Sequence, residues 1–227
     1  MKNPIVEWET LSFSYRGKET SLSSLKPIDL FARDILNFII KELEVKLDWI
    51  PKVKVIYCND EFWMSLLPLS RRVASPGEYT DVNVRLPENW SKVSGFVLPV
   101  VVKDPRDSTK ILRVPRKMRL KVLREIRVVP EVLAFFDATI FLSISNLKND
   151  LRSIPMAVWL VVAHECVHIV EHLTQRCFMQ DLDPKHYEHR LVVNFLRRFM
   201  KNLGAEEFFR RYAPRLEGPP TPSRQKL

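Results

Sequence analysis

The chain has 227 residues, of which 36 are Lys or Arg and 27 are Asp or Glu, so its formal net charge is +9. Only 5 residues are glycine, and there is none between Phe96 and Leu203. Phosphate-binding loops, dinucleotide-binding folds, kinases and α/β-hydrolases need glycine at fixed offsets, so this composition excludes those function classes. With 46% apolar residues, we expect a single domain over residues 1–216 and a disordered Pro-rich tail over residues 217–227.

The first half of the chain predicts one helix and three strands. Residues 1–25 mix polar and aromatic side chains without a sustained period, so we treat them as an extension of uncertain structure. Apolar residues then recur at helical spacing, which predicts a helix over residues 29–47 with Asp29 as its N-cap. Alternating or β-branched runs predict strands over residues 52–58, 81–86 and 96–102, the last of them broken by Pro99.

The middle of the chain combines a basic segment with a further strand. Residues 103–127 hold ten Lys or Arg against three acids, which is +7 of the total charge. Their apolar residues fit both strand and helix periods, and we favour a helix. A strand is expected over residues 138–144, followed by a polar link at residues 145–152.

Two helices are expected to end the domain. Ser153 and Pro155 are typical of a helix start and predict a long helix to about Cys177. A second helix should run from residue 183 or 184 to about residue 202, where Gly204 is a natural stop. The fold class is therefore α+β: a small mixed or antiparallel sheet with an N-terminal helix and two C-terminal helices.

The basic segment, residues 103–127, suits phosphates, a membrane surface or an acidic partner protein, although an ordinary solvated face has the same composition. It contains no aromatic residue on which bases could stack, so any nucleic-acid contact would be to the backbone. The longest apolar run, Ile154–Ala163, is too short to span a membrane, and the N-terminus has no signal-like stretch. Three cysteines cannot all pair, which favours a reducing compartment. We expect a cytoplasmic protein that does not bind membranes.

The pattern that carries chemistry is His164-Glu165-Cys166-Val167-His168, inside the predicted long helix. Two histidines four residues apart share one helix face, so both imidazoles can reach one metal ion. Glu165, on the neighbouring side, can take a proton from a metal-activated water. The alternative interpretation is a hydrogen-bonded pair of core histidines.

A third metal ligand must come from another helix. His172 and Glu171 lie eight and seven residues from His164, too far along one straight helix to share its metal. Glu188 shares a helix face with four apolar residues and is our first choice, with His189 as the second. A salt bridge from Glu188 to an arginine such as Arg190 is the alternative. The four apolar residues are Leu191, Val192, Phe195 and Phe199.

The HECVH motif, followed twenty residues after His168 by Glu188, resembles the gluzincin arrangement of zinc metallopeptidases. Over residues 138–199 the chain looks most like the compact ImmA/IrrE-type zincins. The resemblance implies a zincin-like fold, zinc held by His164, His168 and Glu188, and Glu165 as the general base. It also implies that the strand before the motif helix is an edge strand that pairs with the substrate backbone.

The chain departs from the gluzincin pattern in its supporting residues. Gluzincins often carry an aspartate four residues after the glutamate ligand, and here that residue is Val192. Asp181 and Asp183 are candidate substitutes for orienting a histidine. No further donor to the transition state is fixed by the motif, and the candidates are His172, Tyr187 and Tyr212.

These observations predict a zinc-dependent metallopeptidase that hydrolyses protein or peptide substrates, with Glu165 as general base. The alternative is a non-catalytic protein whose basic segment binds nucleic acid or an acidic partner, with the histidine cluster as a structural or vestigial metal site. The pattern does not specify the substrate sequence or the oligomeric state.

Overall fold

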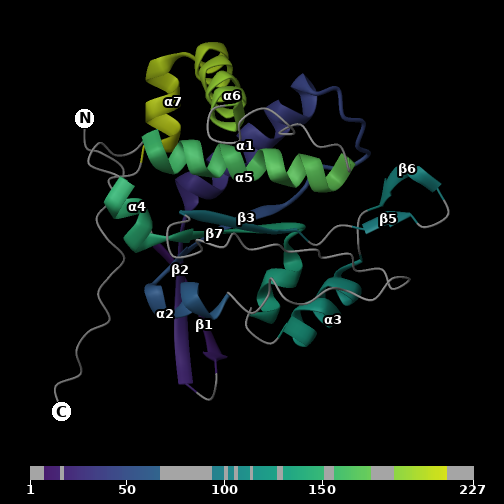
Figure 1. Cartoon of the computed structure of the whole chain (residues 1–227), viewed down its shortest axis with the longest axis vertical. Coiled ribbons are helices and arrows are strands. Elements are labelled where there is room, and N and C mark those ends of the chain that lie inside the picture. The colour runs from purple at the N-terminus through teal and green to yellow at the C-terminus, as the bar shows by residue number, and fades with distance from the viewer. Residues whose placement is uncertain are drawn as a thin grey trace.

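A mixed five-stranded sheet in the order β1-β2-β3-β7-β4 forms the middle layer of the molecule (Figure 1). Strands β3 and β7 are parallel, whereas the other neighbouring pairs are antiparallel. Strands β5 (Val102–Asp104) and β6 (Asp107–Leu112) form a separate two-stranded sheet. The five strands of the main sheet are β1 (Trp8–Tyr15), β2 (Lys18–Leu25), β3 (Val53–Cys58), β4 (Gly95–Pro99) and β7 (Ala138–Ser143).

The computed structural model describes residues 8–15, 18–66, 94–99, 102–104, 107–112, 115–126, 130–150, 156–174 and 187–213. Its helices are α1 (Lys26–Glu42), α2 (Asp60–Ser65), α3 (Arg116–Ile126), the 3₁₀ helix η3 (Glu131–Phe135), α4 (Ile144–Asp150), α5 (Met156–Thr174), α6 (Tyr187–Leu203) and α7 (Ala205–Tyr212).

Helices cover both faces of the sheet (Figure 1). The side chains of β3 alternate between two apolar clusters: Val55 faces α1 and α5, whereas Ile56 packs with the residues of α2 and η3. Strand β7 does the same with Ile140 and Phe141. Because both faces are covered, all six residues of each strand are buried, which explains their nearly continuous apolar sequences.

The predicted α+β class, the mixed sheet and the N-terminal helix are confirmed. The helix begins at Lys26 rather than Asp29, because β2 leads directly into it and Pro27 lies in its first turn. Asp29 is therefore not the N-cap. Its carboxylate accepts hydrogen bonds from the Val55 N–H at 2.8 Å and the Lys54 ammonium at 2.7 Å.

The end of this helix was also placed wrongly, at residue 47 rather than Glu42. Glu44 has a φ of 52°, in the left-handed region, and the chain turns away from the helix axis there. Leu43 and Leu47 still pack against the core from outside the helix. The apolar period therefore continued past the point where the backbone stopped being helical.

Most of the remaining predicted elements exist with shifted bounds. The strands at residues 52–58 and 138–144 are β3 and β7, and the long motif helix is α5. The run 96–102 divides into β4 and β5, with Pro99 as the last residue of β4. The basic segment contains the expected helix, α3, but also strand β6. The predicted strand at residues 81–86, the helix start at Ser153 and Pro155, and the tail at residues 217–227 lie outside the described residues.

Several elements were missed, including α2 and η3. Residues 8–25 contribute the hairpin β1–β2, which extends the sheet beside β3. The polar link predicted at residues 145–152 is largely helix α4. Gly204, with a φ of 85°, does end α6 as expected, but a further helix, α7, starts at the next residue.

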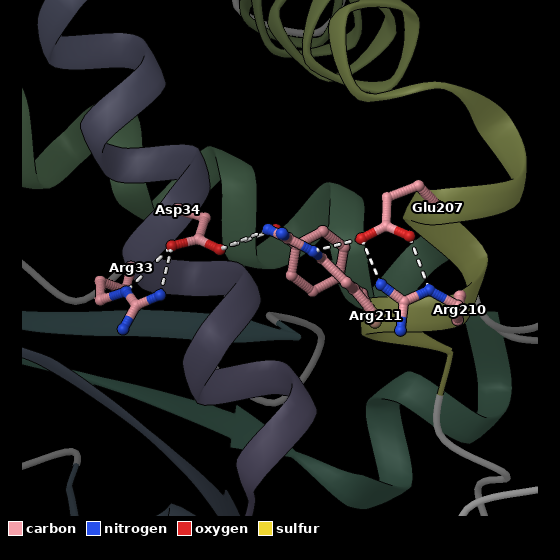
Figure 2. Close-up of polar contacts among 6 residues, drawn as sticks. Arg33, Asp34, Glu207, Arg210 and Arg211 are labelled. Carbon is pink, nitrogen blue, oxygen red and sulfur yellow. Dashed lines mark hydrogen bonds and ion pairs between the residues drawn. The ribbon is translucent and has the colours of Figure 1, made fainter.

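Helix α7 packs against α1 and connects the C-terminal part of the fold to it. Figure 2 shows Asp34 between Arg33 and Arg211, and Glu207 between Arg210 and Arg211. These ion pairs are at the surface and contribute little stability individually. The buried side of α7 contributes Phe208 and Tyr212 to an aromatic cluster with Phe31, Trp159 and Phe199.

Candidate functional site

The motif helix α5 packs on the same face of the sheet as α1, beside that helix, and it also contacts β4, β7 and α6. Its apolar residues are distributed around much of its surface, so ten of its 19 residues are buried. Within the described residues α5 alone is long and apolar enough to cross a membrane by length and composition, although more than half of its apolar stretch is buried inside the fold. The sequence prediction counted only the uninterrupted apolar run before His164, which is shorter than the helix.

His164 and His168 project from the same face of α5, as their spacing predicts. Their Nε2 atoms lie 3.0 Å apart and their ring centroids 4.7 Å apart. Two nitrogens that ligate one tetrahedral zinc ion at about 2.1 Å lie about 3.4 Å from each other. A small opening of this pair therefore reaches ligand spacing, and the two imidazoles fit a shared metal ion.

Glu165 is buried where α5 crosses strand β4. Its exposed fraction is 6%, and a β-carbon at Gly95 would lie 3.1 Å from its Oε1 and collide with Val161 Cγ1. Only glycine allows the strand and the helix to approach this closely. Burial raises the pKa of Glu165 to about 7, although His168 and the backbone N–H of Val97 favour the charged form. A carboxylate with that pKa can accept and return a proton near neutral pH.

Glu171 completes a short polar chain on the same helix. Its Oε2 lies 2.9 Å from Nδ1 of His168, whose Nε2 faces His164. From the sequence, Glu171 was a possible metal ligand only, excluded by its distance from His164 along the helix. The i, i+3 spacing from His168 was the available signal for this contact.

The third proposed ligand, Glu188, belongs to α6 by its backbone, but its side chain lies outside the described residues, as do those of His189 and Tyr187. Helix α6 packs against α5, and Val192, Phe195 and Phe199 of the predicted inward face are buried. Among the residues that the structure describes, no three His, Cys, Asp or Glu side chains gather as a complete metal site. The described part of the candidate site is thus a histidine pair beside a buried glutamate.

The remaining residues proposed as donors or as orienting groups are Tyr212, His172, Asp181 and Asp183. Tyr212 is buried on the α1 side of α5, where its hydroxyl donates to Asp34 at 2.8 Å, so it does not serve the histidine pair. His172 is exposed on α5. Asp181 and Asp183 lie outside the described residues.

The strand expected to bind substrate was identified wrongly. Strand β7, which precedes the motif helix in the sequence, lies between β3 and β4 and therefore has no open edge. Within the described part of the chain, β4 is the strand at this end of the sheet, and β4 is also the strand that contacts Glu165. Among the described residues, the edge strand next to the motif helix is therefore β4 and not β7.

Several cations of the basic segment, residues 103–127, make contacts inside the protein. Arg119 is 4% exposed and pairs with Asp137 at 3.0 Å. Arg124 pairs with Glu131, and the Arg116 guanidinium lies 3.5 Å from the centroid of the Phe135 ring. Binding of nucleic acid or an acidic partner stays a prediction. The three arginines that already make these contacts support it less than the cation count of the segment suggests.

Comparisons with protein-family models, curated proteins and solved structures find no match to this chain.

Proposed function

We propose that this protein is a zinc-dependent metallopeptidase of the zincin type, with a gluzincin-like ligand set of His164, His168 and Glu188. The observation that carries the proposal is the pair of Nε2 atoms 3.0 Å apart beside a buried glutamate. Burial of the Glu165 carboxylate is costly, and a metal ion held by the two partly buried imidazoles beside it would favour its charged form. The packing of α6 on α5 supports Glu188 as the third ligand.

The residues of the site divide the chemistry between them. When bound, a zinc ion would polarise the scissile carbonyl and lower the pKa of a water molecule. Glu165 accepts the proton of the attacking water on its carboxylate and passes it to the nitrogen of the leaving amine. The pKa of about 7 that burial gives Glu165 suits both halves of this transfer at neutral pH.

The outer edge of β4 provides a place for the substrate backbone. The N–H of Ser143 donates to the carbonyl of Ser94 at 3.0 Å, which fixes the hydrogen-bonded pairs between β7 and β4. The pairs alternate along an antiparallel ladder, so the backbone groups of Gly95 and Val97 face away from β7. The Val97 N–H is already directed to the Glu165 carboxylate, so a peptide would pair with the Gly95 backbone and the Val97 carbonyl. Such a peptide lies next to Glu165, which favours an unfolded or extended peptide as substrate.

Metal content tests the ligand set. Full-length protein prepared with zinc should contain about one zinc ion per chain. Glu188→Ala should lose it, whereas Glu165→Gln should retain it because Glu165 is not a ligand. His189→Ala is the matched control on α6 and should retain zinc. Loss in His189→Ala with retention in Glu188→Ala would transfer the ligand role to His189, and wild-type protein without zinc would overturn the site.

Activity tests the reaction. Digestion of a generic peptide library should show cleavage by the wild type that disappears in Glu165→Gln. Since that variant keeps its zinc, the loss would be chemical rather than structural. Zinc-loaded wild-type protein that cleaves no peptide would leave a metal-binding protein without peptidase activity.

A further inference from the structure

His168 is held between two polar side chains of its own helix. Its Nδ1 lies 2.9 Å from Glu171 Oε2, and its Nε2 lies 3.0 Å from Nε2 of His164. The side chains of His168 and Glu171 are 34% and 14% exposed, so the contact is partly shielded from water. Both nitrogens of this ring therefore have defined directions.

The contact with Glu171 determines which nitrogen carries the hydrogen. A carboxylate can only accept a hydrogen bond, so Nδ1 of His168 must be the donor. In the neutral imidazole the lone pair then resides on Nε2, the atom that faces His164. A metal ion needs this unprotonated nitrogen, and the negative charge of Glu171 makes it a better donor to the metal.

Glu171 is not positioned as a ligand itself. The two nitrogens of an imidazole point in different directions, and Glu171 contacts the one that faces away from the Nε2 pair. The residues predicted from the sequence to orient a histidine were Asp181 and Asp183, outside α5. The geometry assigns that role to a residue three positions from the histidine on the same helix turn.

We propose that Glu171 is a positioning residue of the metal centre, which fixes His168 as the Nδ1–H tautomer and directs its Nε2 to the metal. The inference rests on the proposed function, because it assumes that His168 is a ligand. Carboxylates in this position typically contribute a factor of about 10 to 100 to metal affinity.

Zinc affinity of the full chain provides the first test. Metal-free wild type, Glu171→Ala and Glu171→Gln would be titrated with zinc against a chromophoric chelator. Glu171→Ala should bind about 10- to 100-fold more weakly with unchanged stoichiometry. Glu171→Gln keeps an oxygen that can accept from Nδ1, so its loss should be smaller. Glu61→Ala, which removes an exposed glutamate of α2, is the control and should match the wild type.

The tautomer of His168 provides a second test that needs no metal. Nitrogen-15 shifts of the metal-free wild type should show the Nδ1–H form of His168, and Glu171→Ala should lose that preference. The Nε2–H form in the wild type would overturn the proposal even if zinc binds. If Glu171→Ala does not fold, Glu171→Gln supplies the affinity comparison.

The outcomes separate the two proposals. Equal zinc affinity in wild type and Glu171→Ala overturns the role of Glu171 and leaves the metallopeptidase proposal intact. A wild type that binds no zinc overturns the metallopeptidase proposal and, with it, the role of Glu171 at a metal. Weaker zinc binding in Glu171→Ala than in Glu171→Gln, together with loss of the Nδ1–H preference in Glu171→Ala, supports the proposal.

Discussion

Asp137 and Glu165 are both buried carboxylates, but their surroundings balance the charge in different ways. Asp137 is 1% exposed. Its carboxylate forms an ion pair with the Arg119 guanidinium at 3.0 Å and accepts a hydrogen bond from the Lys52 N–H at 2.8 Å. Glu165 is 6% exposed, and the groups that favour its charge are His168 and the Val97 N–H, neither of them Lys or Arg. The Asp137 carboxylate links α3 to the start of β7 through its ion pair with Arg119. The Glu165 carboxyl keeps a pKa near neutrality and can exchange a proton.

The largest expected effect on stability comes from breaking the ion pair between Asp137 and Arg119. Arg119→Met should lower the free energy of unfolding by about 3–5 kcal/mol, because it leaves Asp137 buried without its cation. Urea unfolding at pH 7 measures the change. Arg124→Met is the matched control: its pair with Glu131 is exposed, so the loss should stay below about 1 kcal/mol. Equal, small losses in both variants would mean that burial does not distinguish the two pairs.

Removing the carboxylate of Glu165 should change the free energy of unfolding in the opposite direction, toward greater stability. The folded-state pKa of Glu165, about 7, is above the ordinary value of 4.5, so the native state holds the proton more tightly than the unfolded chain. The stability of the metal-free wild type should therefore fall as pH rises from about 4.5 to 7 and stay low above that.

Glu165→Gln removes this penalty, so at pH 8 the metal-free variant should be more stable than the wild type by on the order of 2–3 kcal/mol. At pH 4 the two should be nearly equal, because the wild-type carboxyl is then protonated in both states. Urea unfolding in the presence of a chelator at several pH values gives the comparison. A variant that is less stable than the wild type at pH 8 would contradict the assigned environment of Glu165.

The contact between β4 and α5 predicts a smaller loss. Gly95→Ala places a methyl group against Val161 and Glu165, so the helix or strand must shift, at a cost of about 1–3 kcal/mol. Val161→Ala makes room, and the double variant should recover much of the loss, which a double-mutant cycle would show as a coupling energy. Additive losses would mean that the close approach at Gly95 does not determine the packing.

The sequence predicted the parts of this site that depend on local spacing. His164 and His168 face each other because residues four apart meet on any helix, and the apolar sequence of α5 made the helix predictable. The hairpin β1–β2 was missed although Leu11, Phe13 and Tyr15 alternate with serines in β1, because the alternation is short and the polar sequence of β2 does not repeat it. Asp29 was misassigned because its partner, Lys54, is distant in the sequence.

Features that depend on the order of strands or on one rotamer were not predictable. The strand next to Glu165 is β4 rather than β7, and that order is set by pairing between distant segments. The contact of Glu171 with His168 needs the ring orientation of His168, which the sequence does not contain. The ligand role of Glu188 stays a prediction.

The smallest effect should come from the far side of α5, where Tyr212 links α7 to α1. Burial, supported by Asp34, raises the pKa of Tyr212 to about 12, so its hydroxyl remains a donor to Asp34 at neutral pH. Tyr212→Phe should cost about 1 kcal/mol in urea unfolding. The Tyr212 carbonyl accepts from Trp159 of α5 through the backbone, which the substitution leaves in place. Zinc affinity should therefore match the wild type, and a loss of affinity without a loss of stability would show that this end of α5 influences the histidine pair.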